Sequence, residues 1–352
     1  MYKITRSMTP FFLTRLSGKL LKSVWFAASI GLLLSLPVLA TAGSGSSSPS
    51  GLAAKSLLLD AARAGDKICA VGQRGHVLLS HDKGLTWRQV IVPTRATLTG
   101  VCFIDPETGW AVGHDAVILK TSDGGESWEK IYQAPDRDQP LLDVWFKTRD
   151  FGFALGAYGL CLNTRDGGRT WKEIMVSPDE WHLNRITETA GGILYIAAEA
   201  GQVYRSHDRG ASWQALPSPY QGSFFGILPL EGDSVLVFGL RGHVFRVADQ
   251  GQSWQKVPTA TLATLTDGLR FKGGRTILVG LAGTVLKGNA SLTGFTSVPG
   301  LKRDGLWSVL ASGQGGMICF GDMGVKRLRL DNPGAFMAQT GIHITKRSGD
   351  PK

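Results

Sequence analysis

Five short stretches of the chain carry an Asp, a Gly, a Ser or Thr and a Trp within a few positions of one another. They are LSHDKGLTW, KTSDGGESW, NTRDGGRTW, RSHDRGASW and RVADQGQSW, ending at Trp87, Trp128, Trp171, Trp213 and Trp254. Such an acidic, glycine-rich loop suggests a Ca²⁺ site or a phosphate site. Ca²⁺ needs about six to eight oxygen ligands, whereas each stretch offers one regular carboxylate. A phosphate-binding turn would open a helix and would not carry a central acid. The residue types therefore favour a structural turn.

The residue types of this turn have a structural explanation. An Asp carboxylate in a turn accepts hydrogen bonds from backbone N–H groups a few residues on. The Gly adopts the positive φ that a tight turn requires. The Trp that follows can place its large ring between neighbouring sheets. We therefore include none of these residues among the candidate site residues.

The spacing of the turns predicts the architecture. Successive Trp residues lie 41, 43, 42 and 41 positions apart, and the same period predicts aromatic residues near 295 and 336, where Phe295 and Phe336 occur. Each unit contains four short apolar segments, with the Asp-containing turn between the third and the fourth. A repeat of about 40 residues with four strands is typical of a β-propeller blade. We therefore predict an all-β, seven-bladed β-propeller of four-stranded blades over residues 55–340.

How the ring closes is less clear from the sequence. SLLLDAA (56–62) occupies the place of the first strand of the first blade, and FMAQTGIHI (336–344) that of the last strand of the seventh. The first blade then takes all its strands from the N-terminal end of the repeats and the seventh all its strands from the C-terminal end, with no strand shared between them. Such a ring closes by side-chain packing alone, unless residues near 50 add a strand.

The N-terminal segment has the pattern of an export signal. Residues 1–23 carry five cations and no acid, and the apolar run VWFAASIGLLLSLPVLATA ends in a small-x-small cleavage pattern. The sequence predicts a signal peptide over 1–42, with an uncleaved anchor as the alternative. No Cys lies near the cleavage site, which argues against a lipid anchor. Residues 43–54 are predicted to be a flexible Gly/Ser linker, and 341–352 a C-terminal tail.

Composition excludes some classes of function. Removal of 1–42 lowers the formal charge from +10 to +5, which is too dilute to indicate nucleic-acid binding. The four cysteines, Cys69, Cys102, Cys161 and Cys319, lie in apolar runs and match no metal motif, so we expect buried core residues. The sequence predicts no cofactor and no metal site.

Candidate binding residues lie in two sets of loops. In a propeller, the turn between the second and third strands shares one face with the blade-to-blade loops, and propeller ligands usually gather there. A mixture of Arg, Trp, Tyr and charged residues is typical of protein recognition. The candidate partner-binding residues are Arg74, His114, Tyr158, Trp181, Glu199, Tyr220, Arg241 and Arg303.

A glycosidase-type site is the alternative. A sialidase-like enzyme needs three arginines that clamp a carboxylate, a Tyr nucleophile paired with an acid, and an Asp acid/base. The Arg-Ile-Pro signature that precedes the first repeat of sialidases is missing. The candidate loops nevertheless supply three arginines and two tyrosines that could converge: Arg74, Arg241, Arg303, Tyr158 and Tyr220. No carboxylate pair stands out on the inner strands, where Asp143, Asp267 and Asp304 come closest.

The repeat also resembles known families. The turn pattern resembles the Asp-box, or BNR repeat, of sialidases and several unrelated propellers. Over nearly the whole mature chain, units of the form GxxGxVLxSxDGGxTW resemble the photosystem II stability/assembly factor family, on Gly72, Gly75, Asp82, Gly84, Trp87 and their counterparts. The resemblance implies a non-catalytic propeller that binds nascent membrane-protein subunits, with an arginine-rich patch involved. Arg74 and Arg241 match that patch best, because the other turns carry Ala, Leu or an acid.

These observations lead to one main hypothesis and two alternatives. We expect an exported, monomeric, non-catalytic scaffold that binds a protein partner, a membrane protein or complex. Its location would be the periplasm, or the thylakoid lumen in a photosynthetic source. The alternatives are a sialidase-like glycoside hydrolase and a carbohydrate-binding propeller.

Overall fold

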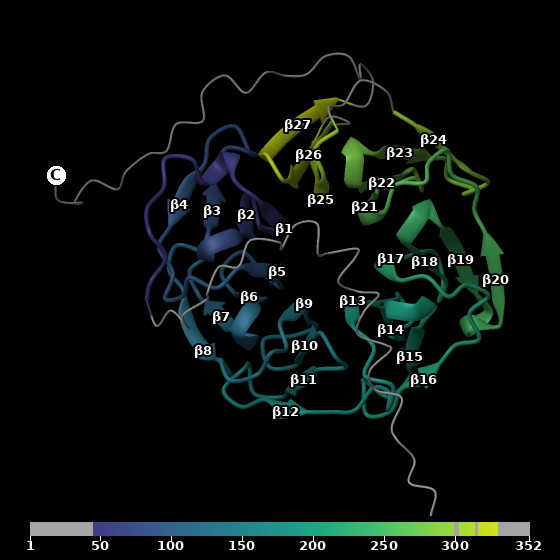
Figure 1. Cartoon of the computed structure of the whole chain (residues 1–352), viewed down its shortest axis with the longest axis horizontal. Helices are drawn as coiled ribbons and strands as arrows, with labels where there is room; N and C mark the ends of the chain where they lie inside the picture. The colour runs from purple at the N-terminus through teal and green to yellow at the C-terminus, as the bar shows by residue number, and fades with distance from the viewer. Residues whose placement is uncertain (1–44, 299–302, 314–315, 330–352) are drawn as a thin grey trace, which may run out of the picture. The chain divides into compact units, whose positions relative to one another are not determined.

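The structure is a computed structural model that describes residues 45–298, 303–313 and 316–329. Seven antiparallel sheets follow one another along this part of the chain, six with four strands and the last with three. The sheets are arranged as the blades of a ring (Figure 1). The predicted seven-bladed propeller is therefore confirmed.

Each blade uses consecutive strands in chain order. The strands of blades one to three are β1 Leu58–Ala64, β2 Lys67–Gly72, β3 Val77–Ser80, β4 Arg88–Val90; β5 Leu98–Phe103, β6 Gly109–Gly113, β7 Ile118–Thr121, β8 Glu129–Tyr132; β9 Leu141–Phe146, β10 Gly152–Gly156, β11 Cys161–Thr164, β12 Lys172–Glu173. Those of blades four and five are β13 Leu183–Glu188, β14 Leu194–Ala198, β15 Val203–Ser206, β16 Gln214–Ala215; β17 Phe224–Pro229, β18 Val235–Gly239, β19 Val244–Ala248, β20 Ser253–Lys256. Those of blades six and seven are β21 Leu265–Arg270, β22 Thr276–Gly280, β23 Val285–Gly288, β24 Phe295–Ser297; β25 Leu306–Gly313, β26 Gly316–Gly321, β27 Gly324–Arg329.

Helical structure in the described residues is limited to single 3₁₀ turns. They are η1 Ala53–Lys55, η2 Gln73–Gly75, η3 His114–Ala116, η4 Glu199–Gly201, η5 Leu240–Gly242, η6 Asp249–Gly251 and η7 Leu281–Gly283. No helix in the described part of the chain has the length and apolar character needed to cross a membrane.

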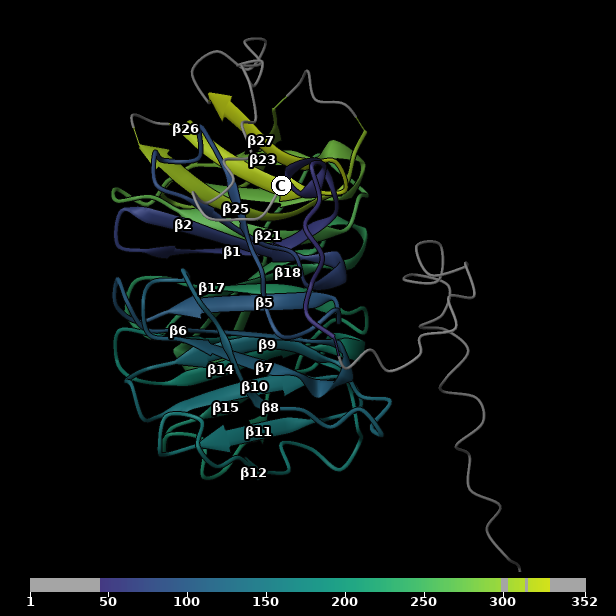
Figure 2. The same ribbon diagram turned by 90° about the vertical axis from the view of Figure 1, so that its left-hand side faces the viewer.

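The first strand of each blade lies nearest the ring axis. The first strands β1, β5, β9, β13, β17, β21 and β25 contact one another in succession, and β25 contacts β1. The strands run between the two faces of the ring (Figure 2). Turns between second and third strands therefore lie on one face, and turns between third and fourth strands on the other.

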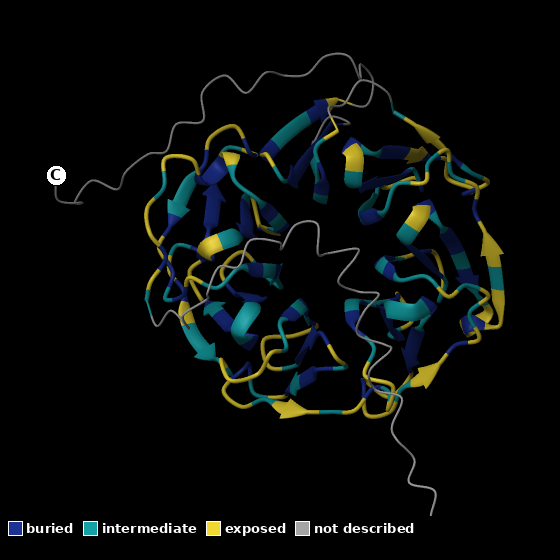
Figure 3. Cartoon of the chain, in the orientation of Figure 1, coloured by how far each residue is buried: buried dark blue, intermediate teal, exposed yellow. Residues whose placement is uncertain are grey.

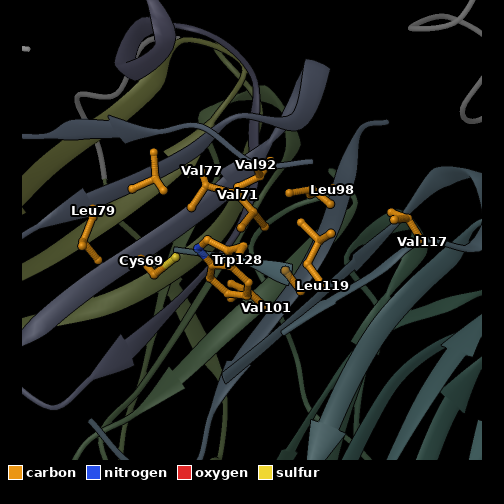
Figure 4. Close-up of a cluster of buried hydrophobic side chains, with 12 residues drawn as sticks. Cys69, Val71, Val77, Leu79, Val92, Leu98, Val101, Val117, Leu119 and Trp128 are labelled. Atoms are coloured by element: carbon orange, nitrogen blue, oxygen red, sulfur yellow. The ribbon is translucent and has the colours of Figure 1, made fainter. Parts of the chain in front are cut away.

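The hydrophobic core lies between neighbouring blades. The second strands are almost wholly buried, whereas the exposed residues lie in the loops and outer strands (Figure 3). One cluster combines Cys69 and Val71 of blade one with Val101 and Leu119 of blade two, and Trp128 packs among them (Figure 4). Because each sheet buries both faces against its neighbours, the ring and its blades stabilise one another.

The Asp-containing turns make the local hydrogen bonds predicted for them. In blade two, the Asp123 carboxylate accepts from the Ser127 N–H at 2.9 Å and from the Thr121 and Ser127 hydroxyls. The Thr121 oxygen in turn accepts from the Gly125 N–H at 2.9 Å. Equivalent bonds surround Asp82, Asp166 and Asp208.

The sixth unit keeps this arrangement with different residues. Asn289 replaces the Asp, and its side chain exchanges hydrogen bonds with the side chain and the N–H of Thr293. Phe295 replaces the Trp and is 5% exposed, packed between blades five and six. The predicted aromatic substitution at 295 is therefore confirmed, whereas Phe336 lies outside the described residues.

The ring closes through side chains between blades seven and one. Trp87 meets Phe320 edge-on, with ring centroids 5.8 Å apart, in a cluster that also contains Ile68 and Ile318. The Ser308 hydroxyl of β25 lies 3.1 Å from the Asp60 carboxylate of β1. The last strand expected in 336–344 and the expected tail 341–352 lie outside the described residues, as does the expected signal peptide 1–42.

Part of the predicted linker is packed against the ring. The Ser47 N–H donates to the Val92 carbonyl at 2.8 Å. Ala53 and Ala54 are fully buried in the cluster that joins blades one and seven. The described residues 45–54 of the Gly/Ser-rich segment are therefore held against the propeller by hydrogen bonds to blade one and the loop after it and by the burial of Ala53 and Ala54. They add no strand to either blade.

The four cysteines are core residues, as expected. All are free thiols; Cys69, Cys161 and Cys319 are buried and Cys102 is half-buried. Among the described residues, no group of three or more His, Cys, Asp or Glu side chains is placed to hold a metal ion.

Candidate protein-binding rim

Hydrogen bonds join the turns between second and third strands to the segments that lead into the first strands. The N–H of the first turn residue donates to the carbonyl just before the first strand, from His114 to Thr97, Glu199 to His182 and Leu240 to Ser223, each at 2.9 Å. The two sets of loops therefore lie together, as predicted. We call this face the rim.

The middle residue of these turns has a left-handed backbone. Its φ lies between 52° and 59° in six blades, at Arg74, Asp115, Tyr158, Ala200, Arg241 and Ala282. Arg74, Tyr158 and Arg241 are exposed there, and Tyr158 is 49% exposed. His114 and Glu199 precede the middle residue by one position and are half-buried. Of the five candidate residues in these turns, three are therefore exposed at the apex of their turn, and His114 and Glu199 lie at the base of theirs.

The glycine after the apex explains why these turns can pack so closely. Gly201 has a φ of 74°, and a Cβ there would lie 1.8 Å from the Tyr220 carbonyl oxygen. A Cβ at Gly75 would lie 2.3 Å from the Thr94 carbonyl oxygen. Only glycine fits both the conformation and the space, so the entry segment of the next blade can cross directly over the turn.

Three predicted residues come together at blades three and four. The Tyr158 ring meets the His182 ring edge-on at 4.8 Å, and His182 Nδ1 lies 3.0 Å from Glu199 Oε2. The Trp181 carbonyl accepts from the Gly159 N–H at 3.1 Å. Burial alone would raise the pKa of Glu199, but the hydrogen bonds and charge of His182 hold it below its usual value. A carboxylate is therefore fixed beside an exposed aromatic ring.

Two further predicted residues line a hollow at blade five. Its volume is about 440 Å³, and it is lined by Pro219, Tyr220, Gln221, Gly222, Leu240, Arg241 and His243. The Tyr220 ring stacks on His243 at 4.4 Å, and its hydroxyl donates to the Leu240 carbonyl at 3.0 Å. Burial, Lys256 and Arg241 lower the pKa of His243, so its imidazole is uncharged at neutral pH. The hollow thus combines apolar rings with one exposed guanidinium.

The remaining predicted residues lie apart from these clusters. Arg74 belongs to blade one and Arg241 to blade five, so blades two to four separate them on one side and blades six and seven on the other (Figure 1). Burial lowers the pKa of His114, although Asp115 and Asp138 act in the opposite direction. Arg303 is exposed before Asp304, which pairs with Lys326 at 2.6 Å. The three candidate arginines therefore lie at separate positions around the rim.

The tyrosines lack the partners that a sialidase-like nucleophile requires. The Tyr220 hydroxyl is engaged with a backbone carbonyl, and in the described part of the chain neither Tyr158 nor Tyr220 is hydrogen-bonded to a carboxylate. Burial also raises the pKa of Tyr220, which opposes formation of the phenolate. The rim geometry therefore suits binding better than glycoside cleavage.

A charged cluster near the ring axis was not among the predicted site residues. Arg185 of β13 lies 3.5 Å from Asp143, 3.7 Å from Asp60 and 3.8 Å from Asp267, and Ser308 lies 3.1 Å from both Asp60 and Asp267. All five occupy the third position of a first strand, where blades two and five carry Gly. A charge at that position is the signal in the sequence, and Asp143 and Asp267 are the members of the cluster that the sequence indicated.

The cluster holds neighbouring blades together. Asp60, Asp143 and Asp267 accept from the N–H groups of Val101, Ile186 and Val309 on the next blade, at 3.0, 2.8 and 2.9 Å. Burial raises the pKa of Asp143 to about 6, although Arg185 opposes the shift. The charged side chains of this cluster therefore bind to one another and to neighbouring blades within the ring.

Comparisons with known proteins agree with the fold. The sequence model of the family described as photosynthesis system II assembly factor YCF48 matches residues 79–140 and 132–287. The photosystem II assembly protein Ycf48 of Thermosynechococcus vestitus is 40% identical over 131 residues, 37% of this chain and 38% of the relative. The photosystem II assembly lipoprotein Ycf48 of Prochlorococcus marinus is 39% identical over 139 residues, 39% of this chain and 41% of the relative. The matched region thus spans about two fifths of these relatives.

The fold also matches a solved structure of that family. The structure described as YCF48 bound to D1 peptide superposes with a TM-score of 0.63 at 16% identity, and covers 77% of this chain and 92% of that chain. The family match extends over more than half of the sequence and includes the repeated turns of blades one to five. This chain therefore belongs to the family of the photosystem II assembly factor Ycf48.

Proposed function

We propose that the protein is an exported, non-catalytic assembly scaffold that binds a polypeptide segment of a membrane protein through its rim. Three facts support this proposal. The chain belongs to the Ycf48 family, its curated relatives are named photosystem II assembly proteins, and a solved member is described as bound to D1 peptide. The partner by this analogy is a subunit of a membrane complex that is under assembly.

The observation that carries the proposal is the set of exposed side chains at the turn apices. Arg74, Tyr158 and Arg241 project from backbone fixed by hydrogen bonds and close glycine contacts. In the described part of the chain, neither arginine is paired with a carboxylate. Arg and Tyr are the types most enriched at binding hot spots, and a guanidinium can form two parallel hydrogen bonds to a carboxylate. The rim therefore suits an acidic or C-terminal peptide.

The proposed location follows from the N-terminal pattern and the relatives. The signal pattern over 1–42 supports export to the periplasm, or to the thylakoid lumen of a photosynthetic source. The Prochlorococcus relative is named a lipoprotein, which places that protein at a membrane. A soluble ring beside a membrane could reach the exposed loops and termini of a membrane subunit.

The test is a charge reversal of the rim. We expect the double change Arg74→Glu and Arg241→Glu to reduce recovery of the membrane partner about tenfold or more, because two charge-assisted contacts become repulsive. The measurement is quantitative mass spectrometry after co-purification from detergent-solubilised source membranes. The matched control is Lys272→Glu with Arg275→Glu in the turn between β21 and β22, which changes the same charge on the opposite face. Equal recovery with the folded rim variant would contradict the proposal.

A further inference from the structure

A second hollow lies on the face opposite the rim, at the junction of blades three and four. Its volume is about 230 Å³, and it is lined by Lys147, Thr148, Phe151, Arg165 and Arg209. Lys147, Thr148 and Phe151 come from the turn between β9 and β10. Arg165 follows β11, and Arg209 follows β15 in the next blade. Three cations from two blades therefore surround one small space.

The two arginines of this hollow are free to bind an anion. Arg165 lies over the Phe151 ring at 5.2 Å, and Arg209 is exposed on a left-handed backbone with a φ of 57°. In the described part of the chain neither is paired with a carboxylate, whereas Lys147 is paired with Glu188. The nearby acids Asp166 and Asp208 direct their carboxylates into their own turns. The hollow thus has an excess of positive charge.

Comparison with four other junctions shows a contact that this junction lacks. At four junctions, a Lys or Arg of the preceding blade donates to a backbone carbonyl of the Asp-containing turn: Lys67 to Asp123, Lys120 to Gly167, Arg205 to Gln250 and Arg327 to Lys83. At the junction of blades three and four, Asn163 occupies the position of Lys120 and Arg205. Its amide donates within its own blade, to Gly152 O at 2.9 Å. The side chain that would cross this junction is therefore absent.

We propose that this hollow is a binding site for a phosphate group. A guanidinium presents its N–H donors in a planar fork that matches phosphate oxygens, and an ammonium adds a third cation. The Thr148 hydroxyl accepts from the Phe151 N–H at 3.1 Å, which leaves its own proton available to the ligand. Phe151 provides an apolar wall for whatever group the phosphate carries. Free phosphate compounds and anionic lipid headgroups share this chemistry.

The experiment compares two double variants that remove the same charge. Calorimetric titration of the full protein with inorganic phosphate, against chloride at equal ionic strength, measures the free-ligand arm. Flotation with phosphatidylglycerol or phosphatidylcholine vesicles measures the lipid arm. The pocket variant is Arg165→Gln with Arg209→Gln, and the control is Lys272→Gln with Arg275→Gln in the turn between β21 and β22, where Arg275 lies over Phe271 as Arg165 lies over Phe151. We expect the pocket variant to bind phosphate about tenfold or more weakly, and the control to bind unchanged.

Each outcome decides the proposal. Phosphate binding without vesicle binding assigns a soluble phosphate ligand, and vesicle binding lost only in the pocket variant assigns a lipid headgroup. Failure of the wild type to bind either probe would overturn the proposal, as would equal losses in both double variants. Because Gln can perturb the turn, Arg165→Lys with Arg209→Lys serves as a second variant, expected to keep partial binding through its retained charge. Co-purification of the membrane partner reports the rim separately, so the two proposals fail independently.

Discussion

The pKa values of aspartates shift in opposite directions in two parts of this protein. In the repeated turns, the hydroxyl and N–H of Thr170 hold the pKa of Asp166 at about 2, and those of Ser212 do the same for Asp208. Their stabilising effect is present above the unfolded pKa of about 4 and is lost as pH falls from about 4 to about 2. Near the ring axis, burial instead favours the protonated carboxyl.

The axial cluster gives a pH prediction with the opposite sign. Because the pKa of Asp143 is about 6 in the folded protein, the native state binds more protons than the unfolded state between about pH 4 and pH 6. The contribution of Asp143 to the free energy of unfolding therefore falls as pH rises through that window, by about 3 kcal/mol. Asp143→Asn should remove this component, as measured by urea unfolding at pH 4 to 7. The exposed turn variant Asp66→Asn is the control, and an unchanged pH slope in Asp143→Asn would refute the assignment.

At the scale of the structural element, the repeated unit consists of the Asp-containing turn and the aromatic ring that follows it. This ring packs between two neighbouring sheets. Trp128 donates its indole N–H to the Gly125 carbonyl at 3.1 Å and meets Phe103 edge-on at 6.0 Å. The ring thus ties its own turn to the core shared with blade one. Phe295 shows that a smaller ring without the N–H can fill the same position.

This comparison predicts the order of two substitutions. Trp128→Ala should lower the free energy of unfolding by about 3–5 kcal/mol, because it empties a buried site between two sheets. Trp128→Phe should cost clearly less, because a ring still separates the sheets. Urea unfolding followed by circular dichroism measures both values. Equal losses for Ala and Phe would show that the indole N–H, not the volume of the ring, stabilises the packing at this position.

At the scale of the whole molecule, closure of the ring depends on the junction of blades seven and one. Gly324 has a φ of 78°, and a Cβ there would lie 2.0 Å from the Ala54 carbonyl oxygen. Gly273 has a φ of 87° but nothing within 4 Å of a Cβ. The two glycines share a positive φ, and they differ in how closely other atoms surround them.

Alanine at these two positions therefore separates local strain from ring closure. Gly273→Ala should cost about 1–2 kcal/mol, because of its left-handed backbone. Gly324→Ala should cost more and should speed hydrogen exchange in β25, β26 and β27 and in β1. Hydrogen exchange with mass spectrometry localises the change. Closure would not depend on the Ala54 contact if the two variants had equal stability and equal exchange in those strands.

The sequence by itself determined the repeat and therefore the architecture. The constant spacing from Trp87 to Trp254 gave the blade count, and Phe295 was placed by the same period. It also separated the two faces, because strand order fixes which turns share a face. These features are local and periodic, so a single chain displays them without any knowledge of distant contacts.

Only the tertiary structure decided which side chains meet. It brought Tyr158 and Glu199 together around His182, placed Arg74 far along the ring from Arg241, and joined Asp60, Asp143 and Asp267 to Arg185. It also left a hollow at the junction of blades three and four, where Asn163 stands in the strand position from which Lys120 and Arg205 bridge their junctions. The physical reason is that most of these contacts join different blades, and their geometry depends on how the ring curves and how each turn packs on the next blade. No spacing within one repeat encodes that geometry.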